Sequence, residues 1–226
     1  FTDGTFLRGA AIGALSSETG DGIFAFYETL EAEVKRLAAA RTPGIFRMPV
    51  ERTFVQKGFG VVTTGIPVAG TIQPGMPVEL TPGGQRGRIR AMQRFLRDAA
   101  EGGQGQCLAL NIPEFGKLHP ERGQVISLPG YLRPAYCFHL RVKTVPGLDP
   151  PLRHGEQIRF HTGTSGEPGT IYLLDDKTLG GNAEGNATVV LAEPIAAAPH
   201  DRLILRPLSP ASTLAGRYDL PLPEAA

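Results

Sequence analysis

Cysteine is scarce in this chain, and long apolar stretches are missing. Cys107 and Cys137 are the two cysteines among 226 residues, and they form neither a CxxC pair nor the framework of a small secreted protein, which points to a reducing, cytoplasmic compartment. No apolar run approaches the roughly 20 residues that a membrane helix needs, so we expect a soluble protein with no membrane partner. The formal net charge of +1 does not exclude a local basic face, because arginines concentrate in residues 86–97 and 133–159.

Several sequence motifs are missing as well. The start, FTDGTFLRG, has neither an initiator methionine nor the charged and apolar regions of a signal peptide, so we expect a segment of a longer protein. No G-x-x-x-x-G-K-[ST] loop occurs, and without its backbone cradle and lysine, nucleotide phosphates have no site. No serine stands in the glycine pattern of a nucleophile elbow. We therefore expect no enzyme activity and no cofactor in this segment.

Glycine and proline, by contrast, are abundant, with 29 and 20 residues. They are spaced between short runs of β-branched and apolar residues rather than clustered. This spacing favours many short strands joined by tight turns over disorder. The chain is therefore expected to be mainly β.

Residues 1–42 differ from the rest. The apolar run 10–15 is suited to a buried strand, and a serine-rich loop after it ends in Asp21, a candidate helix cap. Apolar residues then recur at helical spacing over 22–41, before a Thr-Pro-Gly sequence. The pattern predicts a βα unit, which is too small to bury both of its faces alone.

Residues 43–131 and 132–216 each show the pattern of a small β-barrel, in which closure removes exposed sheet edges. Residues 217–226 resemble a linker. We expect strands over 46–56, 60–68, 78–81, 86–93, 106–112 and 124–128 in the first barrel, and over 135–144, 157–162, 170–174, 187–193 and 202–207 in the second.

Three stretches of the first barrel, PVERTF (49–54), KGFGVVTTG (57–65) and IQPGMPVEL (72–80), resemble the second domain of translational GTPases, which holds the aminoacyl end of a tRNA. QIRFHTGTS (157–165), GTIYLLDD (169–176) and HDRLILRPLSPASTLAG (200–216) look like the third domain of the bacterial selenocysteine-specific elongation factor. The resemblance implies two translation-factor barrels, preceded by the closing βα piece of a P-loop GTPase domain. Ser16, Ser17 and Glu18 would then be the remnant of the guanine-contacting loop.

This family delivers selenocysteyl-tRNA to the ribosome at recoded UGA codons. The resemblance implies that the full-length protein uses GTP and Mg²⁺ and reads an mRNA hairpin through winged-helix domains that are not in this sequence. The present chain would retain part of the tRNA-binding surface, and we expect it to be a monomer.

Carried over by position, the resemblance nominates an aminoacyl pocket of five residues and two contacts to the tRNA acceptor end. In the strand 106–112, Leu108 and Leu110 alternate with Cys107, so Cys107 should face away from the core. We expect it to share one slot between neighbouring strands with Arg52, which could pair with an ionised selenol. The pocket residues are Glu51, Arg52, Phe54, Thr64 and Cys107, and the acceptor-end residues are Arg90 and Gln93.

Two pocket positions depart from the family's usual pattern. Glu51 stands where the family has Asp, and Cys107 stands where a second Arg is usual, which removes a positive charge. Arg47 or Arg88 would have to reach into the pocket to replace that charge.

Other interpretations remain open. Ser209 to Asp219 argues against elongation factor Tu, but an initiation-factor subunit that carries tRNA, or a β-barrel that binds protein, also fits the pattern. The arginines at alternate positions from Arg86 to Arg94 fit either a solvated strand face or an RNA contact. Cys137 and His139 share a strand face, which allows a metal site, although packing is the commoner reason for such a pair.

Overall fold

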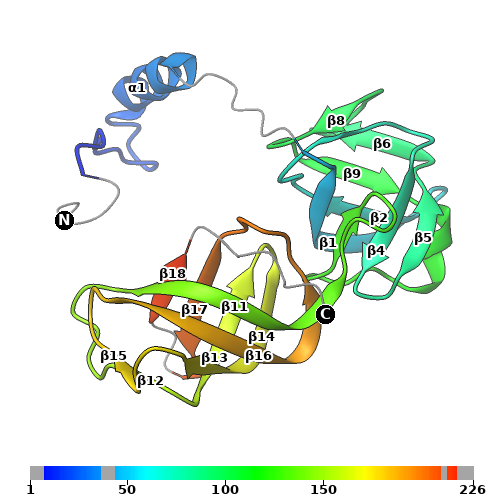
Figure 1. Cartoon of the computed structure of the whole chain (residues 1–226). Helices are drawn as coiled ribbons and strands as arrows, with labels where there is room; N and C mark the ends of the chain where they lie inside the picture. Colours follow the sequence, from blue (N-terminus) through cyan, green and yellow to red (C-terminus); the bar gives the residue numbers. More distant parts are fainter. Residues whose placement is uncertain (1–7, 37–43, 210–212, 218–226) are drawn as a thin grey trace. The chain divides into compact units, whose positions relative to one another are not determined.

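The computed structural model describes residues 8–36, 44–209 and 213–217. The chain divides into two compact units, residues 1–41 and 42–226 (Figure 1). The first unit is helical in its described part, and the second is built from β-strands. Within the described residues, no helix has the length and apolar character to cross a membrane.

The first unit contains the helix α1 (Ile23–Arg36). Its last turn carries Lys35 and Arg36, which suit the negative end of the helix dipole. Asp21 accepts a hydrogen bond from the Thr19 hydroxyl at 2.8 Å, so its carboxylate serves the loop before the helix. The apolar stripe of α1 is exposed throughout, since no residue of the helix is buried.

The strand expected at 10–15 does not form, because these residues are irregular and exposed. A single strand leaves its backbone donors and acceptors unpaired, and the described part of this unit offers no second strand. The βα prediction is therefore correct for the helix and wrong for the strand.

The first barrel contains ten strands and one 3₁₀ helix. Its main sheet has the order β5-β4-β10-β1-β2-β9-β6-β7, and β3 pairs with β8. The elements are β1 (Arg47–Gln56), β2 (Gly60–Gly65), β3 (Thr71–Ile72), β4 (Pro77–Thr81), β5 (Gln85–Arg88), β6 (Ala91–Arg94), β7 (Arg97–Asp98), β8 (Gly102–Gly103), β9 (Leu108–Asn111), η1 (Pro113–Lys117) and β10 (Val125–Ser127).

The strand expected at 86–93 is divided into β5 and β6 by a change of partner. Up to Arg88 the chain pairs with β4, whereas the backbone N–H of Arg90 donates to Asn111 on β9 at 2.9 Å. Ile89 between them is buried. The two sides of the sheet are thus joined by the chain itself and enclose one apolar core, which includes Phe46, Leu110 and Ile126.

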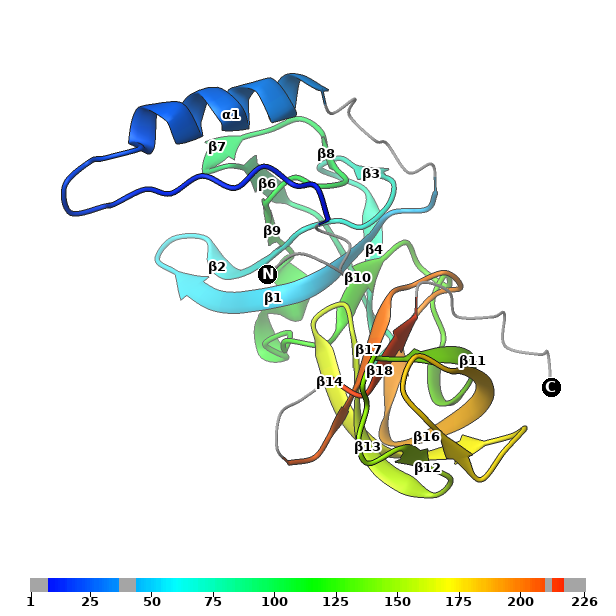
Figure 2. The same cartoon turned by 90° about the vertical axis from the view of Figure 1, so that its left-hand side faces the viewer.

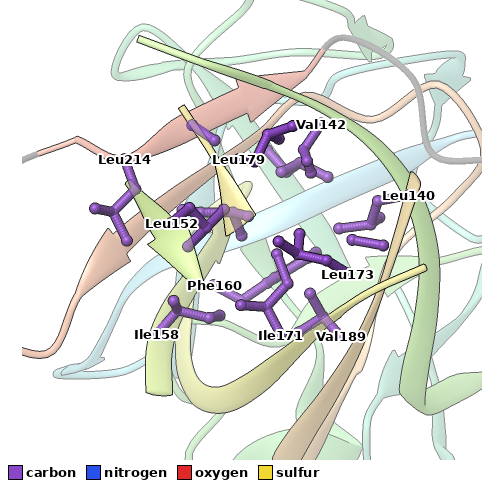
Figure 3. Packing of buried hydrophobic residues seen from close by; sticks show 14 of the residues in the cluster. Leu140, Val142, Leu152, Ile158, Phe160, Ile171, Leu173, Leu179, Val189 and Leu214 are labelled. Carbon is purple, nitrogen blue, oxygen red and sulfur yellow. The ribbon is translucent and has the colours of Figure 1, made fainter. Parts of the chain in front are cut away.

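The second barrel is closed in the order β11-β16-β14-β13-β17-β18. Its core side chains converge from several strands (Figure 3). Phe138 stacks on Phe160 with ring centroids 5.3 Å apart. The strands are β11 (Pro134–Thr144), β13 (Glu156–Thr162), β14 (Ser165–Leu173), β16 (Glu184–Ala196), β17 (Leu203–Pro207) and β18 (Ala215–Arg217), and a small ladder pairs β12 (Leu152–Arg153) with β15 (Thr178–Leu179).

The two barrels contact each other within the second unit. Arg47 Nη1 lies 2.6 Å from Asp201 Oδ2, and both side chains are largely buried. Asp201 also accepts a hydrogen bond from the backbone N–H of Ala198 at 2.8 Å. A small apolar cluster draws on both barrels as well, through Val125 on one side and Leu132, Ala196 and Ala198 on the other. Arg47 is therefore committed to a structural ion pair.

We expect that removing residues 1–42 leaves the remaining chain folded, because the second unit has its own cores and α1 buries none of its residues. Urea unfolding of residues 43–226, followed by far-ultraviolet circular dichroism, should show a cooperative transition dominated by β signal. Loss of that transition would contradict a division of the chain near residue 42. The further boundary between 131 and 132 stays a prediction.

Candidate functional site

A row of outward-facing side chains, exposed at Arg52 and half-buried at the other three positions, crosses four strands of the first barrel. Arg52 on β1 is paired with Thr64 on β2, Thr64 with Ala109 on β9, and Ala109 with Gln93 on β6. Directly paired residues on neighbouring strands point to the same face of a sheet. The next row, which includes Thr63, Leu110 and Met92, is buried and points into the core. The row from Arg52 to Gln93 therefore lies on the outer face, over about 14 Å.

A β-bulge in β1 determines the face of the sheet to which Arg52 points. Val50 pairs with Gly65 and Arg52 pairs with Thr64, so Glu51 is the extra residue on β1. The bulge moves β1 from buried residues, which end at Val50, to the half-exposed and exposed residues that follow. A Cβ at Gly65 would lie 2.2 Å from the Pro49 carbonyl oxygen, so the close approach of the two strands at the bulge requires glycine.

Cys107 is exposed and just precedes β9, two residues from Ala109. As expected, it faces away from the core. The expectation that Cys107 and Arg52 face one slot between neighbouring strands is wrong, because β2 lies between β1 and β9. Consecutive strands β1 and β2 form a hairpin, and β9 adds to the free side of β2. Thr64 therefore stands between the two predicted pocket residues.

Arg90 and Asn111 hold the turn between β1 and β2. The Arg90 guanidinium donates to the Phe59 carbonyl at 2.7 Å, and the Asn111 amide donates to the same carbonyl at 2.8 Å and to that of Val61 at 2.9 Å. Asn111 is buried, and its own Oδ1 has no partner among the described residues. Arg90 was nominated for the tRNA acceptor end. To contact RNA, its guanidinium would have to give up or share the hydrogen bond to the Phe59 carbonyl.

The other nominated residues differ in whether their side chains are hydrogen-bonded within the protein. Gln93 donates to Asp98 Oδ1 at 3.0 Å, within the β6–β7 hairpin. Phe54 is exposed on β1, on the same face as Arg52. The guanidinium of Arg52 has no hydrogen-bond or ion-pair partner among the described residues. Of the nominated cations, Arg52 is thus better able than Arg90 to accept an anionic partner.

Most of the arginines at alternate positions of the strand expected at 86–93 form ion pairs or hydrogen bonds within the protein. Arg86 forms an ion pair with Glu79 at 3.0 Å, and Arg88 donates to the Gly75 carbonyl. Arg47 is paired with Asp201. Both arginines that could replace the missing positive charge at Cys107, Arg47 and Arg88, are therefore already bonded within the protein.

Ser16, Ser17 and Glu18 lie in the first unit, in a loop closed by its own hydrogen bonds. The backbone N–H of Thr19 donates to Ser16 Oγ at 3.2 Å, and that of Gly20 donates to the Ser16 carbonyl at 2.9 Å. These residues do not share a unit with the row from Arg52 to Gln93 in the first barrel.

In the second barrel, His161 lies among positive charges. Partial burial and the guanidinium groups of Arg206 and Arg159 lower the pKa of His161 below its ordinary value. The neutral imidazole of His161 is therefore favoured. At Cys137 and His139, the imidazole Nδ1 lies 2.9 Å from the Thr188 hydroxyl. The described residues contain no group of three or more ligands placed to hold a metal ion.

A cleft of about 530 Å³ lies where the two barrels meet. Its walls include Pro49 and Gly105 from the first barrel and Thr164 from the second, together with the Arg47–Asp201 pair. None of the nominated pocket residues lines it. Sequence reasoning missed this cleft because strand patterns within one barrel carry no information about its neighbour.

Comparisons with known proteins identify the relatives of this chain. Residues 139–221 match the family model described as "Selenocysteine-specific elongation factor, beta-barrel domain". A selenocysteine-specific elongation factor from Desulfomicrobium baculatum is 30% identical over 217 residues, which is 94% of this chain and 34% of that protein. The chain belongs to the family of selenocysteine-specific elongation factors. The factor from Haemophilus influenzae is also 30% identical, over 95% of this chain and 33% of its own length.

A solved structure supports the same assignment. The crystal structure of the bacterial selenocysteine-specific elongation factor EF-Sec superposes with a TM-score of 0.72 at 26% identity, covering 88% of this chain and 32% of that chain. The chain thus spans about a third of the length of the selenocysteine-specific factors that it matches. The expected translation-factor fold is confirmed.

Two contributors to this face were missed at the sequence level. Ala109 stands in the middle of the row, and its small side chain leaves space between Thr64 and Gln93. Asn111 fixes the hairpin turn beside the row. The signal for Asn111 was present, because an amide in an otherwise apolar alternation must find partners when it is buried.

Proposed function

We propose that this chain holds the acceptor end of selenocysteyl-tRNA on the outer face of its first barrel, as part of an elongation factor that delivers this tRNA to the ribosome at recoded UGA codons. The observation that supports the proposal most strongly is the outward-facing row from Arg52 to Gln93 in a chain of this family. The row brings together residues that are 41 positions apart in the sequence, Arg52 and Gln93.

The chemistry of the row fits an acceptor end. An unpaired RNA 3′ end offers phosphates, 2′-hydroxyls and a base edge, which call for a cation, hydroxyl or amide groups and space. Arg52 supplies an unengaged guanidinium, Thr64 a hydroxyl, Gln93 an amide, and Ala109 the space between them. Phe54 adds an exposed ring on the same face for stacking.

Discrimination of the amino acid is assigned to Arg52. An ionised selenol carries a negative charge that the hydroxyl of a seryl group lacks, so a guanidinium selects between them. Glu51, displaced from the ladder by the bulge, and Cys107, which carries no positive charge, leave Arg52 as the main cation of the proposed pocket.

The remaining parts of the activity are assigned to other segments of a longer protein. We assign no GTP site to the residues present, because the phosphate-binding sequence G-x-x-x-x-G-K-[ST] does not occur among them. GTP with Mg²⁺, the ribosome and an mRNA hairpin would therefore be bound with the help of further domains. We propose a cytoplasmic monomer.

Salt dependence tests the proposal against a protein-binding barrel. Binding of selenocysteyl-tRNA should be measured with the whole gene product that carries these residues, at several salt concentrations. Phosphate contacts should make the logarithm of affinity fall linearly with the logarithm of salt, by about 0.7 to 0.9 per contact. Absence of tRNA binding at low salt, or a flat dependence, would contradict the proposal.

A further inference from the structure

A tight turn joins the neighbouring strands β6 and β7 (Figure 2). Its two central residues are apolar and exposed, in an unfavourable backbone conformation. Phe95 and Leu96 have φ values of 48° and 64°, as both central residues of a type I′ turn require. Asn and Gly are usual at such positions, and bulky residues there are strained. Burial does not compensate, because Phe95 is 62% and Leu96 is 92% exposed.

Two like charges flank this turn. Arg94 and Arg97 are directly paired across the hairpin, an arrangement that destabilises a ladder. In the described part of the chain, neither guanidinium has a hydrogen-bond or ion-pair partner. The carboxylate of Asp98, the next residue on β7, accepts a hydrogen bond from Gln93 and belongs to the pair on the opposite face of the ladder. Among the described residues, the side chains of 94–97 are therefore held neither by burial nor by ion pairs.

We propose that this tip, residues 94–97, is a second RNA-binding site of the chain, where an unpaired base stacks on Phe95 while Arg94 and Arg97 contact the phosphates on either side. An exposed aromatic ring between arginines is the side-chain combination that binds single-stranded RNA. An apolar protein surface would accept Phe95 and Leu96 but would leave both arginines without anions. Gln93 points to the face of the hairpin opposite to Arg94 and Arg97. The backbone N–H of Phe95 donates to the Cys107 carbonyl at 3.2 Å, so the tip lies beside the acceptor-end row and presents its arginines on the other face.

The first test separates a role in binding from a role in folding. Replacing both turn residues, in the variant F95N/L96G, supplies the sequence that a type I′ turn prefers. The melting temperature of the 226-residue chain should rise, whereas its affinity for a short fluorescein-labelled single-stranded RNA, measured by anisotropy at low salt, should fall about 5- to 150-fold. A lower melting temperature would show that Phe95 and Leu96 serve the fold and would overturn the proposal.

Single variants separate the ring from the charges. Phe95→Leu keeps an apolar side chain and removes the aromatic ring, so it should weaken binding of single-stranded RNA and change binding of blunt duplex RNA little. Arg97→Ser should lower the salt dependence by about one contact. Arg153→Ser, an exposed arginine of the second barrel, is the matched control and should leave both RNAs unaffected.

The source of the RNA is identified by competition. Displacement of the labelled strand by uncharged tRNA, but not by unrelated single strands, would assign the site to tRNA, and displacement by both would assign it to unpaired RNA in general. Because none of these probes carries an amino acid, the result does not depend on the proposed aminoacyl pocket. RNA affinity that is equal in wild type, Phe95→Leu and F95N/L96G would overturn the proposal and leave a protein partner as the alternative.

Discussion

Replacing Arg52 with alanine should weaken binding of selenocysteyl-tRNA more than binding of seryl-tRNA. The expected difference is about 1–3 kcal/mol, the range for a hydrogen bond to a charged group. The physical reason is that the Arg52 guanidinium, unengaged among the described residues, would lose an ionised selenol in one case and a neutral hydroxyl in the other. Equilibrium binding of both tRNAs to the whole gene product, at fixed salt, measures the difference.

Two further variants make this experiment decisive. Cys107→Arg would restore the positive charge that the family usually has there, and the preference for selenocysteyl-tRNA should then widen as pH rises through the selenol pKa, because only the selenolate gains. Arg153→Ala is the control for loss of an exposed arginine. Equal losses for the two tRNAs in Arg52→Ala would show that Arg52 grips the shared acceptor end and does not discriminate the side chain.

Gly65→Ala should destabilise the first barrel by about 2–3 kcal/mol, as expected for overpacking against atoms that cannot move aside. The new methyl group would lie 2.2 Å from the Pro49 carbonyl oxygen and 2.9 Å from Met48 Cγ, so β1 and β2 would have to separate at the bulge. Urea unfolding at equilibrium should show a lower midpoint.

The same change should also impair tRNA binding under conditions where the variant remains folded, because the bulge at Glu51 sets the placement of Arg52 against Thr64. Gly116→Ala is the matched control, since a methyl group at Gly116 would meet no atom within 4 Å. Equal stability of the two variants would contradict the close approach of β1 and β2 at this point.

Residue patterns along the sequence determined the class of fold and most of the strands. Periodicity placed the helix within 22–41, and period-two alternation correctly directed Leu108 and Leu110 inward and Cys107 outward. The helix was predictable because its stripe and its end signals are local. The strand at 10–15 was not, because a strand exists only with a partner and the described first unit contains none.

The candidate site depended more on tertiary structure. The sequence named Arg52, Thr64 and Gln93 through its resemblance to a family, but the pairing of strands is what aligns them in one row. The sequence could not show that β2 separates Arg52 from Cys107. Nor could it show that Arg47 forms an ion pair with Asp201, which is 154 positions away. Alternation along one strand fixes which face a side chain takes, whereas strand order and contacts between barrels arise from pairings between distant residues, on which local pattern carries no information.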